Sequence, residues 1–286
     1  MNYLSRLVSP VLLKSLSSKE VNYLKKIFLK FEGLPDLNEL WGLMDETWVE
    51  LGCNSNRVDD RVKNFYNHPV WLLNGIFSEV DPQSIKFRKT FTSWIKIQAP
   101  KRVADFGGGY GTLASLIIKV LPNSLIEIID PYPNPALINY RSSKNLKFAK
   151  NFSEKYDLIT AIDVFEHLSD PIADLKRSGK YLRSGGWYLI ANCFHPVIKC
   201  HLPQHFHLRD SWDYIMKAMG YEIGEDVAYG RAYRKIAKPN EILAREISKR
   251  AKNIDLYVKY FKTEKSSRLN SILDRLYRII CKIVFP

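Results

Sequence analysis

The stretch from Val103 to Ala114 constrains the fold of this 286-residue chain more than any other segment. A short apolar run leads into Asp105, glycines occupy positions 107, 109 and 111, and an apolar pattern with helical spacing begins at Leu113. Glycine tolerates positive φ angles and lets the backbone approach a ligand closely, while a helix N-terminus presents free N–H groups. The segment therefore predicts a strand, a tight glycine-rich turn and a helix that begins at a ligand.

Two kinds of ligand use a turn of this type. A dinucleotide fold prefers G-x-G-x-x-G, whose third glycine allows the helix to pack closely on the strand. This chain has Thr112 at the third position and Gly111 one residue earlier, so an NAD-dependent oxidoreductase is the weaker interpretation. The G-x-G-x-G spacing, with Asp105 two residues upstream, resembles the first signature of class I methyltransferases that depend on S-adenosylmethionine (SAM).

The residues that follow extend this resemblance. Asp130 ends an apolar run over 124–129 and lies 19 residues beyond Gly111, where a carboxylate can accept hydrogen bonds from both ribose hydroxyls of a nucleoside. After a third short strand, Asn151 and Phe152 stand where the family places a polar residue on the adenine amine and an apolar one beside its ring. Many relatives have Asp where this chain has Asn151, which is a departure from the pattern.

A fourth predicted strand over 156–162 is followed by Asp163 and by the string Glu-His-Leu at 166–168. This string resembles the same region of methyltransferases that act on small molecules such as quinones. The resemblance covers roughly residues 99–236 and implies an α/β fold. It implies a seven-stranded sheet, mostly parallel with its last strand antiparallel, flanked by helices. Ligands of such sheets bind at the carboxyl ends of the strands.

The resemblance also implies SAM as the cofactor and S-adenosylhomocysteine (SAH) as the product, with no metal required. The first acid and the glycines would hold the methionine end, and the second acid would hold the ribose. The acid after the fourth strand would lie near the amino group or the transferring methyl. The expected cofactor-binding residues are Asp105, Gly107, Gly109, Gly111, Asp130, Asn151, Phe152 and Asp163.

Three histidines are candidates for the base that deprotonates the methyl acceptor, because histidine titrates near neutral pH. His195, which follows the fifth predicted strand, is preferred. His167, four residues beyond Asp163, comes second, and His205 comes third. The histidines crowded between 195 and 207 also raise the alternative of a metal site. Their spacing matches no strong zinc pattern and the chain has no Cys-x-x-Cys, so no metal is predicted.

The pattern divides the chain into three regions. Residues 1–98 are predicted to form a helical cap or substrate region, in which Asp36 caps a helix to Val49 and Asp81 caps one to Gln98. Residues 99–237 are predicted to form the SAM-binding domain, and residues 238–286 basic amphipathic helices. Some aromatic residues of the first region either line an acceptor pocket or fill a helix-bundle core; these are Trp71, Phe77, Phe91 and Trp94.

The net charge of +13 lies mostly near the C-terminus. Residues 231–286 carry 15 Lys and Arg against five Asp and Glu, which leaves only three net charges for the rest of the chain. A nucleic-acid enzyme usually surrounds its active cleft with positive charge, so no nucleic-acid partner is expected. An apolar face from Leu269 to Ile283, flanked by basic residues, suits peripheral contact with an anionic membrane, docking on its own domain or dimerisation.

Other features predict a cytoplasmic protein. No apolar run reaches the length of a transmembrane helix, the first ten residues lack a signal-peptide core, and the four cysteines show no disulfide pattern. The predicted function is SAM-dependent methylation of an oxygen on a small molecule such as a sugar, a glycolipid precursor or another polyol. A quinone or other aromatic small molecule is the alternative acceptor. A non-catalytic binding protein with the same fold is a further alternative.

Overall fold

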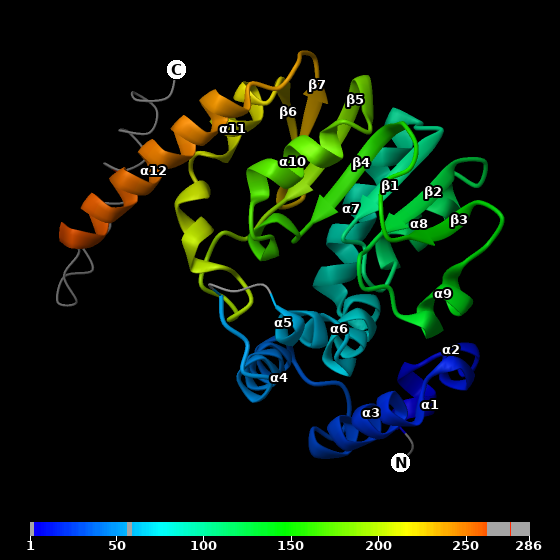
Figure 1. Cartoon of the computed structure of the whole chain (residues 1–286). Helices are drawn as coiled ribbons and strands as arrows, with labels where there is room; N and C mark the ends of the chain where they lie inside the picture. The colour runs from blue at the N-terminus through cyan, green and yellow to red at the C-terminus, as the bar shows by residue number, and fades with distance from the viewer. Residues whose placement is uncertain (1–2, 56–58, 262–274, 276–286) are drawn as a thin grey trace.

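A computed structural model describes residues 3–55, 59–261 and 275 of the chain, and Figure 1 shows it as a sheet with helices on both faces and a helical region at one end. The region before the first strand is helical, as predicted. Its helices are α1 (Tyr3–Leu7), α2 (Pro10–Ser15), α3 (Ser18–Lys30), α4 (Leu37–Glu50), α5 (Asp60–Tyr66), α6 (Pro69–Val80) and α7 (Pro82–Gln98).

Local capping explains where two of these helices begin. The side chain of Asp36 accepts from the backbone N–H of Glu39, whose own carboxylate accepts from the N–H of Asp36, so the predicted capping box at α4 is confirmed. Asp81 accepts from the N–H of Ser84 at 2.7 Å, and Pro82 takes the first helical position of α7. Proline has no backbone N–H, and the first N–H groups of a helix have no partner within the helix, so Pro82 is well suited to the start of α7.

The sheet has seven strands in the order β3-β2-β1-β4-β5-β7-β6. Strand β7 runs antiparallel to both of its neighbours and the other six strands run parallel to one another, which confirms the predicted sheet. The strands are β1 (Arg102–Phe106), β2 (Leu125–Ile129), β3 (Leu146–Ala149), β4 (Tyr156–Ile162), β5 (Leu182–Ala191), β6 (Tyr221–Val227) and β7 (Gly230–Lys235).

Glycines lie at two irregular sites in the last three strands. Gly185 and Gly186 lie inside β5, in an irregularity of its pairing with β4. The β6–β7 turn is formed at 228–229, where Ala228 has a φ of 52°, and Gly230 is already the first residue of β7. Glycine permits irregular backbone conformations and is therefore found at both sites. Its presence in the sequence does not determine which kind of irregularity forms.

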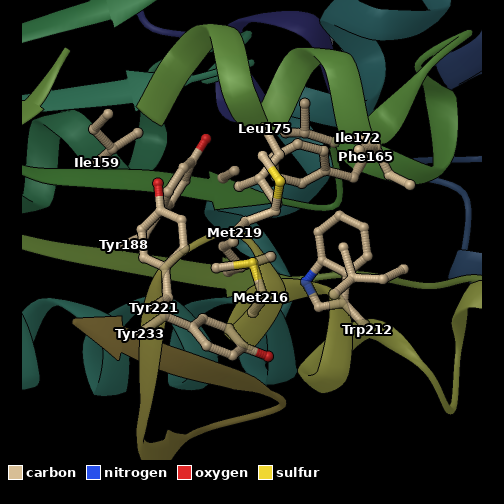
Figure 2. Packing of buried hydrophobic residues seen from close by; sticks show 14 of the residues in the cluster. Ile159, Phe165, Ile172, Leu175, Tyr188, Trp212, Met216, Met219, Tyr221 and Tyr233 are labelled. Carbon is tan, nitrogen blue, oxygen red and sulfur yellow. The ribbon is translucent and has the colours of Figure 1, made fainter. Parts of the chain in front are cut away.

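Helices cover both faces of the sheet. One face packs against α10 (Pro171–Gly179), α11 (Trp212–Ala218) and α12 (Glu241–Phe261), and Figure 2 shows Trp212, Met216 and Met219 converging there with Tyr188 of β5. The other face packs against α7 and α8 (Thr112–Val120). The crossover between β2 and β3 contains α9 (Pro135–Arg141). Two short 3-10 helices, η1 (Phe165–His167) and η2 (Pro203–Leu208), follow β4 and β5.

The helices α1–α6 have a hydrophobic core of their own. This core extends into the α/β unit, because Ala136 and Leu137 of α9 and Ile198 and Cys200 of the segment after β5 are buried in it. Helix α7 instead packs on α8 and the sheet, although it precedes β1. The packing therefore joins the predicted regions across residue 98.

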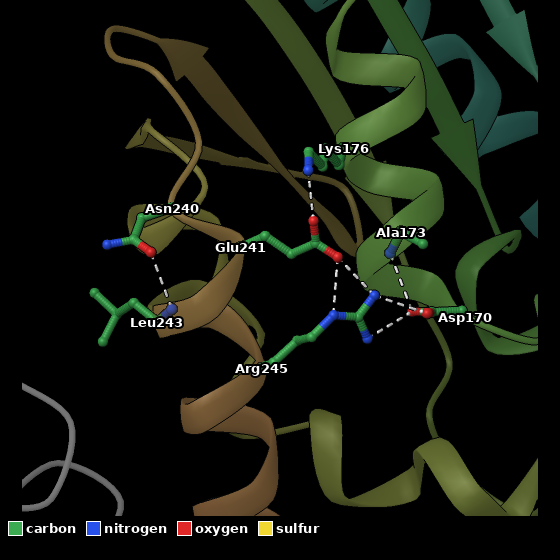
Figure 3. A network of polar contacts seen from close by, with 7 residues as sticks. All are labelled: Asp170, Ala173, Lys176, Asn240, Glu241, Leu243 and Arg245. Atoms are coloured by element: carbon green, nitrogen blue, oxygen red, sulfur yellow. Dashed lines mark hydrogen bonds and ion pairs between the residues drawn. The ribbon is translucent and has the colours of Figure 1, made fainter.

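Helix α12 docks on the α/β unit. Its residues Ala244, Ile247 and Ala251 are buried in the same core as β5 and α11. Figure 3 shows how its first turn is tied to α10: Glu241 bonds Lys176 at 2.6 Å, and Arg245 bonds Asp170 at 2.9 Å. The predicted amphipathic face from Leu269 to Ile283 lies outside the described residues. In the described part of the chain, the helices are too short or too polar to cross a membrane.

Candidate active site

A cavity of about 1200 Å³ lies where the carboxyl ends of the central strands meet the N-terminal helices. One end, here called the sheet end, is lined by residues that follow β1 to β4, among them Asp105, Asp130 and Asp163. The other, called the helix end, is lined by α3–α6, by η1 and by residues 192–201 after β5. Pockets for drug-sized ligands usually measure about 300–1,000 Å³, so this cavity is larger than most of them.

The glycine-rich turn follows β1 and forms part of the sheet end. Gly107 and Gly109 line the cavity with φ angles of 67° and 48°, in the region that favours glycine. A Cβ on Gly107 would lie 2.6 Å from Val164. Gly111, with a φ of 78°, does not line the cavity; it precedes α8, and a Cβ there would lie 2.8 Å from Ile128. Its place in the structure is therefore at the helix start and not on the cavity wall.

Asp105 is nearly buried at the end of β1. One carboxylate oxygen accepts from the hydroxyl of Thr160 at 2.6 Å, and the other has no hydrogen-bond partner among the described residues. Burial raises the pKa of Asp105 to about 6, although the Thr160 bond and the charge of Arg88 oppose this shift. The unpartnered oxygen of a buried acid is costly in the empty protein, and a bound cationic group would remove that cost.

Asp130 follows β2 and links the second strand to the glycine turn. Its carboxylate accepts from the N–H of Tyr132 at 2.8 Å and from the N–H of Gly109 at 3.2 Å. Burial raises its pKa, and both hydrogen bonds oppose that shift. Asn151 and Phe152 also line the sheet end, after β3, and the Phe152 ring packs 5.3 Å from that of Phe106. The structure thus gathers these residues at one end of the cavity.

Asp163 follows β4 and adopts a left-handed backbone conformation with a φ of 54°. The hydroxyl of Tyr229 donates to its carboxylate at 2.7 Å. Asp163 lines the cavity, and burial raises its pKa, although the Tyr229 bond and the charge of Arg88 oppose this shift. It caps neither of the two helices that follow, because Val164 stands at the N-cap of η1 and Asp170 caps α10. A strained residue held at a cavity wall is typical of functional sites.

Two residues at the sheet end carried no signal in the sequence. Arg88 of α7 lines the cavity, and its charge partly opposes the rise in the pKa of Asp105 and Asp163 that burial causes. Tyr229 reaches the cavity from the β6–β7 turn, and its ring packs 5.4 Å from that of Phe91. Both come from elements distant in sequence, and no local motif marked either of them.

The three candidate histidines lie in different environments. His195 is exposed and lines the cavity. His167, on η1, also lines it, and its Nδ1 donates to the carbonyl of Cys200 at 3.1 Å; desolvation, and to a smaller degree His201, lower the pKa of His167 to about 3. His205 does not line the cavity but is buried on η2, so the structure contradicts its predicted place at the site.

Glu166 precedes His167 and is completely buried. Its Oε1 accepts from the N–H of Cys193 at 2.8 Å, while Oε2 has no hydrogen-bond partner in the described parts of the chain. Desolvation, with a further contribution from Asp163, raises the pKa of Glu166 to about 8. The Glu-His-Leu string indicated a resemblance but no role for its glutamate, so Glu166 was not among the predicted site residues.

The four aromatic residues singled out in the N-terminal region were expected either to line an acceptor pocket or to fill a helical core, and the structure shows two of each kind. Trp71 and Phe91 line the cavity. Phe77 is buried in the helical core, and Trp94 packs in the sheet core with its indole N–H bonded to Glu225 at 2.7 Å. The Trp71 ring lies edge-on to His167, with centroids 6.1 Å apart. The helix end of the cavity is therefore aromatic and borders the histidines.

Comparison with known proteins agrees with this geometry. Residues 83–224 match the sequence model of a family described as a methyltransferase domain. The ubiquinone biosynthesis O-methyltransferase of Hydrogenovibrio crunogenus is 25% identical over 154 residues, which cover 49% of this chain and 62% of that protein. The tRNA U34 carboxymethyltransferase of Campylobacter fetus subsp. fetus is 27% identical over 186 residues, which cover 59% of this chain and 64% of that protein. The chain thus matches less than two thirds of the length of these relatives.

A solved structure of an O-methyltransferase family protein from Burkholderia thailandensis aligns with a TM-score of 0.48 at 13% identity, over 71% of each chain. The family match over residues 83–224 and the strand order described above are consistent with a class I, SAM-dependent methyltransferase domain, as the resemblance predicted. This assignment disfavours the NAD-dependent oxidoreductase.

Proposed function

We propose that this protein transfers a methyl group from SAM to an oxygen of a small molecule. One observation carries the proposal: a single large cavity joins the glycine turn and the acids of the strand ends to an aromatic, histidine-containing wall. Residues 1–98 would supply much of that wall, and residues 99–237 the cofactor site. Residues 238–286 would form a third segment outside it.

In this proposal the sheet end binds SAM. Asp130 accepts from the ribose hydroxyls, while Asn151 and Phe152 contact the adenine. The methionine end lies against Gly107, Gly109 and Asp105, whose unpartnered carboxylate oxygen suits the cofactor's ammonium group. Arg88, which the sequence had not indicated, suits the cofactor's carboxylate because a guanidinium forms strong charge-assisted bonds with such groups. Asp163 lies near the sulfonium, and Gly111 acts by setting the start of α8.

The reaction needs alignment more than activation, because the sulfonium is already a good leaving group. A lone pair of the acceptor oxygen attacks the methyl carbon, the carbon–sulfur bond breaks, and its electrons remain on the sulfur of SAH. The acceptor's proton passes to a base, for which His195 is proposed because it lines the cavity and is exposed to it. The lowered pKa makes His167 a weak base, and His205 lies away from the cavity.

The proposed acceptor is a sugar, a glycolipid precursor or another polyol. Support comes from the helix end, where aromatic faces such as Trp71 stand beside polar side chains such as Lys19 and Glu20. Sugars combine apolar ring faces with many hydroxyl groups and suit such a wall. An aromatic acceptor is the second candidate, supported by the relative in ubiquinone biosynthesis and by the same aromatic residues.

Binding of the donor is tested first. Isothermal titration with SAH, and with NAD as the control, should give micromolar affinity for SAH alone. Failure of SAH to bind would refute the cofactor assignment. The acceptor is then sought by incubating the protein with methyl-labelled SAM and panels of sugars and polyols, hydroxylated quinones, or tRNA. Label in the first panel supports the proposed acceptor, and label only in the second or third overturns it. Binding without label in any panel favours the non-catalytic alternative.

Contact with a membrane or a second copy is a separate part of the proposal, and its support is the positive charge of residues 231–286. In a co-sedimentation experiment, the full chain should sediment with vesicles rich in anionic lipid. A variant lacking residues 266–286 should remain in the supernatant. Light scattering of both proteins tests dimerisation. If the deletion changes neither vesicle binding nor mass, this part of the proposal is refuted.

A further inference from the structure

Glu166, His167 and His201 form a cluster at the helix end of the cavity. One ligand atom of each residue lies within 4.8 Å of the other two. Glu166 and His167 come from η1 after β4, and His201 comes from the segment after β5. The rings of the two histidines have centroids 4.9 Å apart, at 71° to each other. The fold therefore brings His201 beside two neighbouring residues, Glu166 and His167, that lie more than 30 residues earlier in the sequence.

Each of the three side chains is held in place through its other polar atom. Nδ1 of His167 donates to the carbonyl of Cys200 at 3.1 Å, and Nδ1 of His201 donates to the carbonyl of His195 at 2.9 Å. A carbonyl only accepts, so both Nδ1 atoms carry the proton and both Nε2 atoms are left with a free lone pair. Oε1 of Glu166 accepts from the N–H of Cys193. Hydrogen bonds of this kind orient metal-binding side chains in proteins.

A second observation points independently to a missing ligand. Oε2 of Glu166 is buried and has no hydrogen-bond partner among the described residues. A buried polar atom without a partner costs about 1–3 kcal/mol, and more when it is charged. The two histidines line the cavity, so a ligand can reach the cluster from there. Two imidazole nitrogens and one carboxylate oxygen are a set that binds zinc and other divalent transition metals.

We propose that Glu166, His167 and His201 bind one divalent transition-metal ion, of which zinc is the type, at the helix end of the cavity. Metal–ligand bonds in such sites are about 2.0–2.2 Å long, so donors no more than 4.8 Å apart can reach a common ion after small side-chain rotations. With three protein ligands, the ion would have at least one further coordination position, open toward the cavity. This proposal differs from the expectation drawn from sequence spacing, which matched no zinc pattern.

The ion's role rests on the proposed function, whereas its binding does not. A metal at this position would bind the acceptor's oxygen in its open position and stabilise the deprotonated form. It would also hold that oxygen near His195, whose carbonyl is bonded to His201. The cluster would thus orient the acceptor, and the sheet end would orient the donor.

The test measures metal binding directly, without SAM or an acceptor. The full chain, purified without a histidine tag and stripped with a chelator, is titrated with ZnCl₂ by calorimetry and analysed for metal content. We expect one zinc per chain, and at least a roughly tenfold loss of affinity in Glu166→Gln, His167→Gln and His201→Gln. His205→Gln and His207→Gln are matched controls, since both histidines are buried nearby but outside the cluster, and they should bind like the original protein.

Two results would overturn the site: no zinc bound by the folded chain, or equal affinity in His201→Gln and the original protein. Circular dichroism checks that each variant is folded. If Glu166→Gln does not fold, the two histidine variants still decide the question. Co²⁺ serves as a second probe, because its visible absorption reports a low-symmetry nitrogen and oxygen environment and should be lost in His167→Gln. Titration with SAH in parallel separates this outcome from failure of the proposed function.

Discussion

The two ends of the cavity are built in different ways. At the sheet end, most residues lie at or just after the end of a strand, and the parallel sheet brings the strand ends together; Asp130 accepts from the N–H of Gly109, which follows the neighbouring strand. At the helix end, the wall is assembled from helices far apart in the sequence and from the segment after β5. The strand order therefore sets the proposed cofactor site, and packing between distant segments sets the proposed acceptor site.

The comparison predicts that variants at the two ends will have separable effects. Residues of the sheet end should change SAH affinity, and residues of the helix end should change acceptor turnover. Variants that change both equally would mean that the cavity acts as one unit.

His195→Asn should have the largest effect. Loss of a general base lowers kcat by about 10²–10⁴-fold, whereas SAH affinity should stay unchanged because the residue lies outside the sheet end. The measurement is methyl transfer to whichever acceptor the panels identify. His205→Asn is the control, since that histidine does not line the cavity. Full activity in His195→Asn would remove this residue from the mechanism.

Asp130→Ala should weaken SAH binding by more than tenfold. Two hydrogen bonds to a charged group are lost, each contributing about 1.5–3 kcal/mol, and the N–H of Gly109 also loses its partner. Glu20→Ala is the matched control, because it removes an acid from the helix end of the same cavity. Calorimetric titration of both variants with SAH shows which end of the cavity binds this ligand. Equal losses of affinity would contradict the assignment of the ribose to Asp130.

The affinity for SAH should fall in acid because of Asp105. Burial gives the empty protein a pKa of about 6 at this carboxyl group, and the ligand's ammonium group favours the ionised form. Below pH 6 the carboxyl must lose its proton before binding, so affinity should decrease by up to about tenfold per pH unit. Above pH 7 it should be constant. Titrations between pH 5 and 8 test this, and Asp105→Asn should bind weakly with no such dependence.

Glu241→Gln should have the smallest effect, and it serves as a control for the variants at both ends of the cavity. The residue joins α12 to α10 through Lys176 and Arg245, in the partly exposed network of Figure 3. Solvent screens such pairs, so Tm should change by only a few degrees, with less effect at high salt. SAH affinity and turnover should match the original protein. A large change in either would mean that α12 helps to position the cavity wall.

The sequence was most informative where residues act within one local unit. The strand, turn and helix at 102–120 follow from glycines that adopt positive φ and from apolar spacing, and the caps at Asp36 and Asp81 depend on neighbours three residues away. The order of the strand-end acids was also visible, because a parallel sheet gathers the residues that follow its strands. The sheet and the sheet end of the cavity were predicted for these reasons.

Tertiary structure alone decided the rest, because contacts between distant segments leave no periodic trace in a sequence. It separated Trp71 and Phe91, which line the cavity, from Phe77 and Trp94, which are core residues. It placed His205 away from the cavity and brought His201 beside Glu166 and His167. Local backbone preferences determined the strand-end residues of the proposed cofactor site, whereas packing among side chains far apart in the chain determined the wall of the proposed acceptor site.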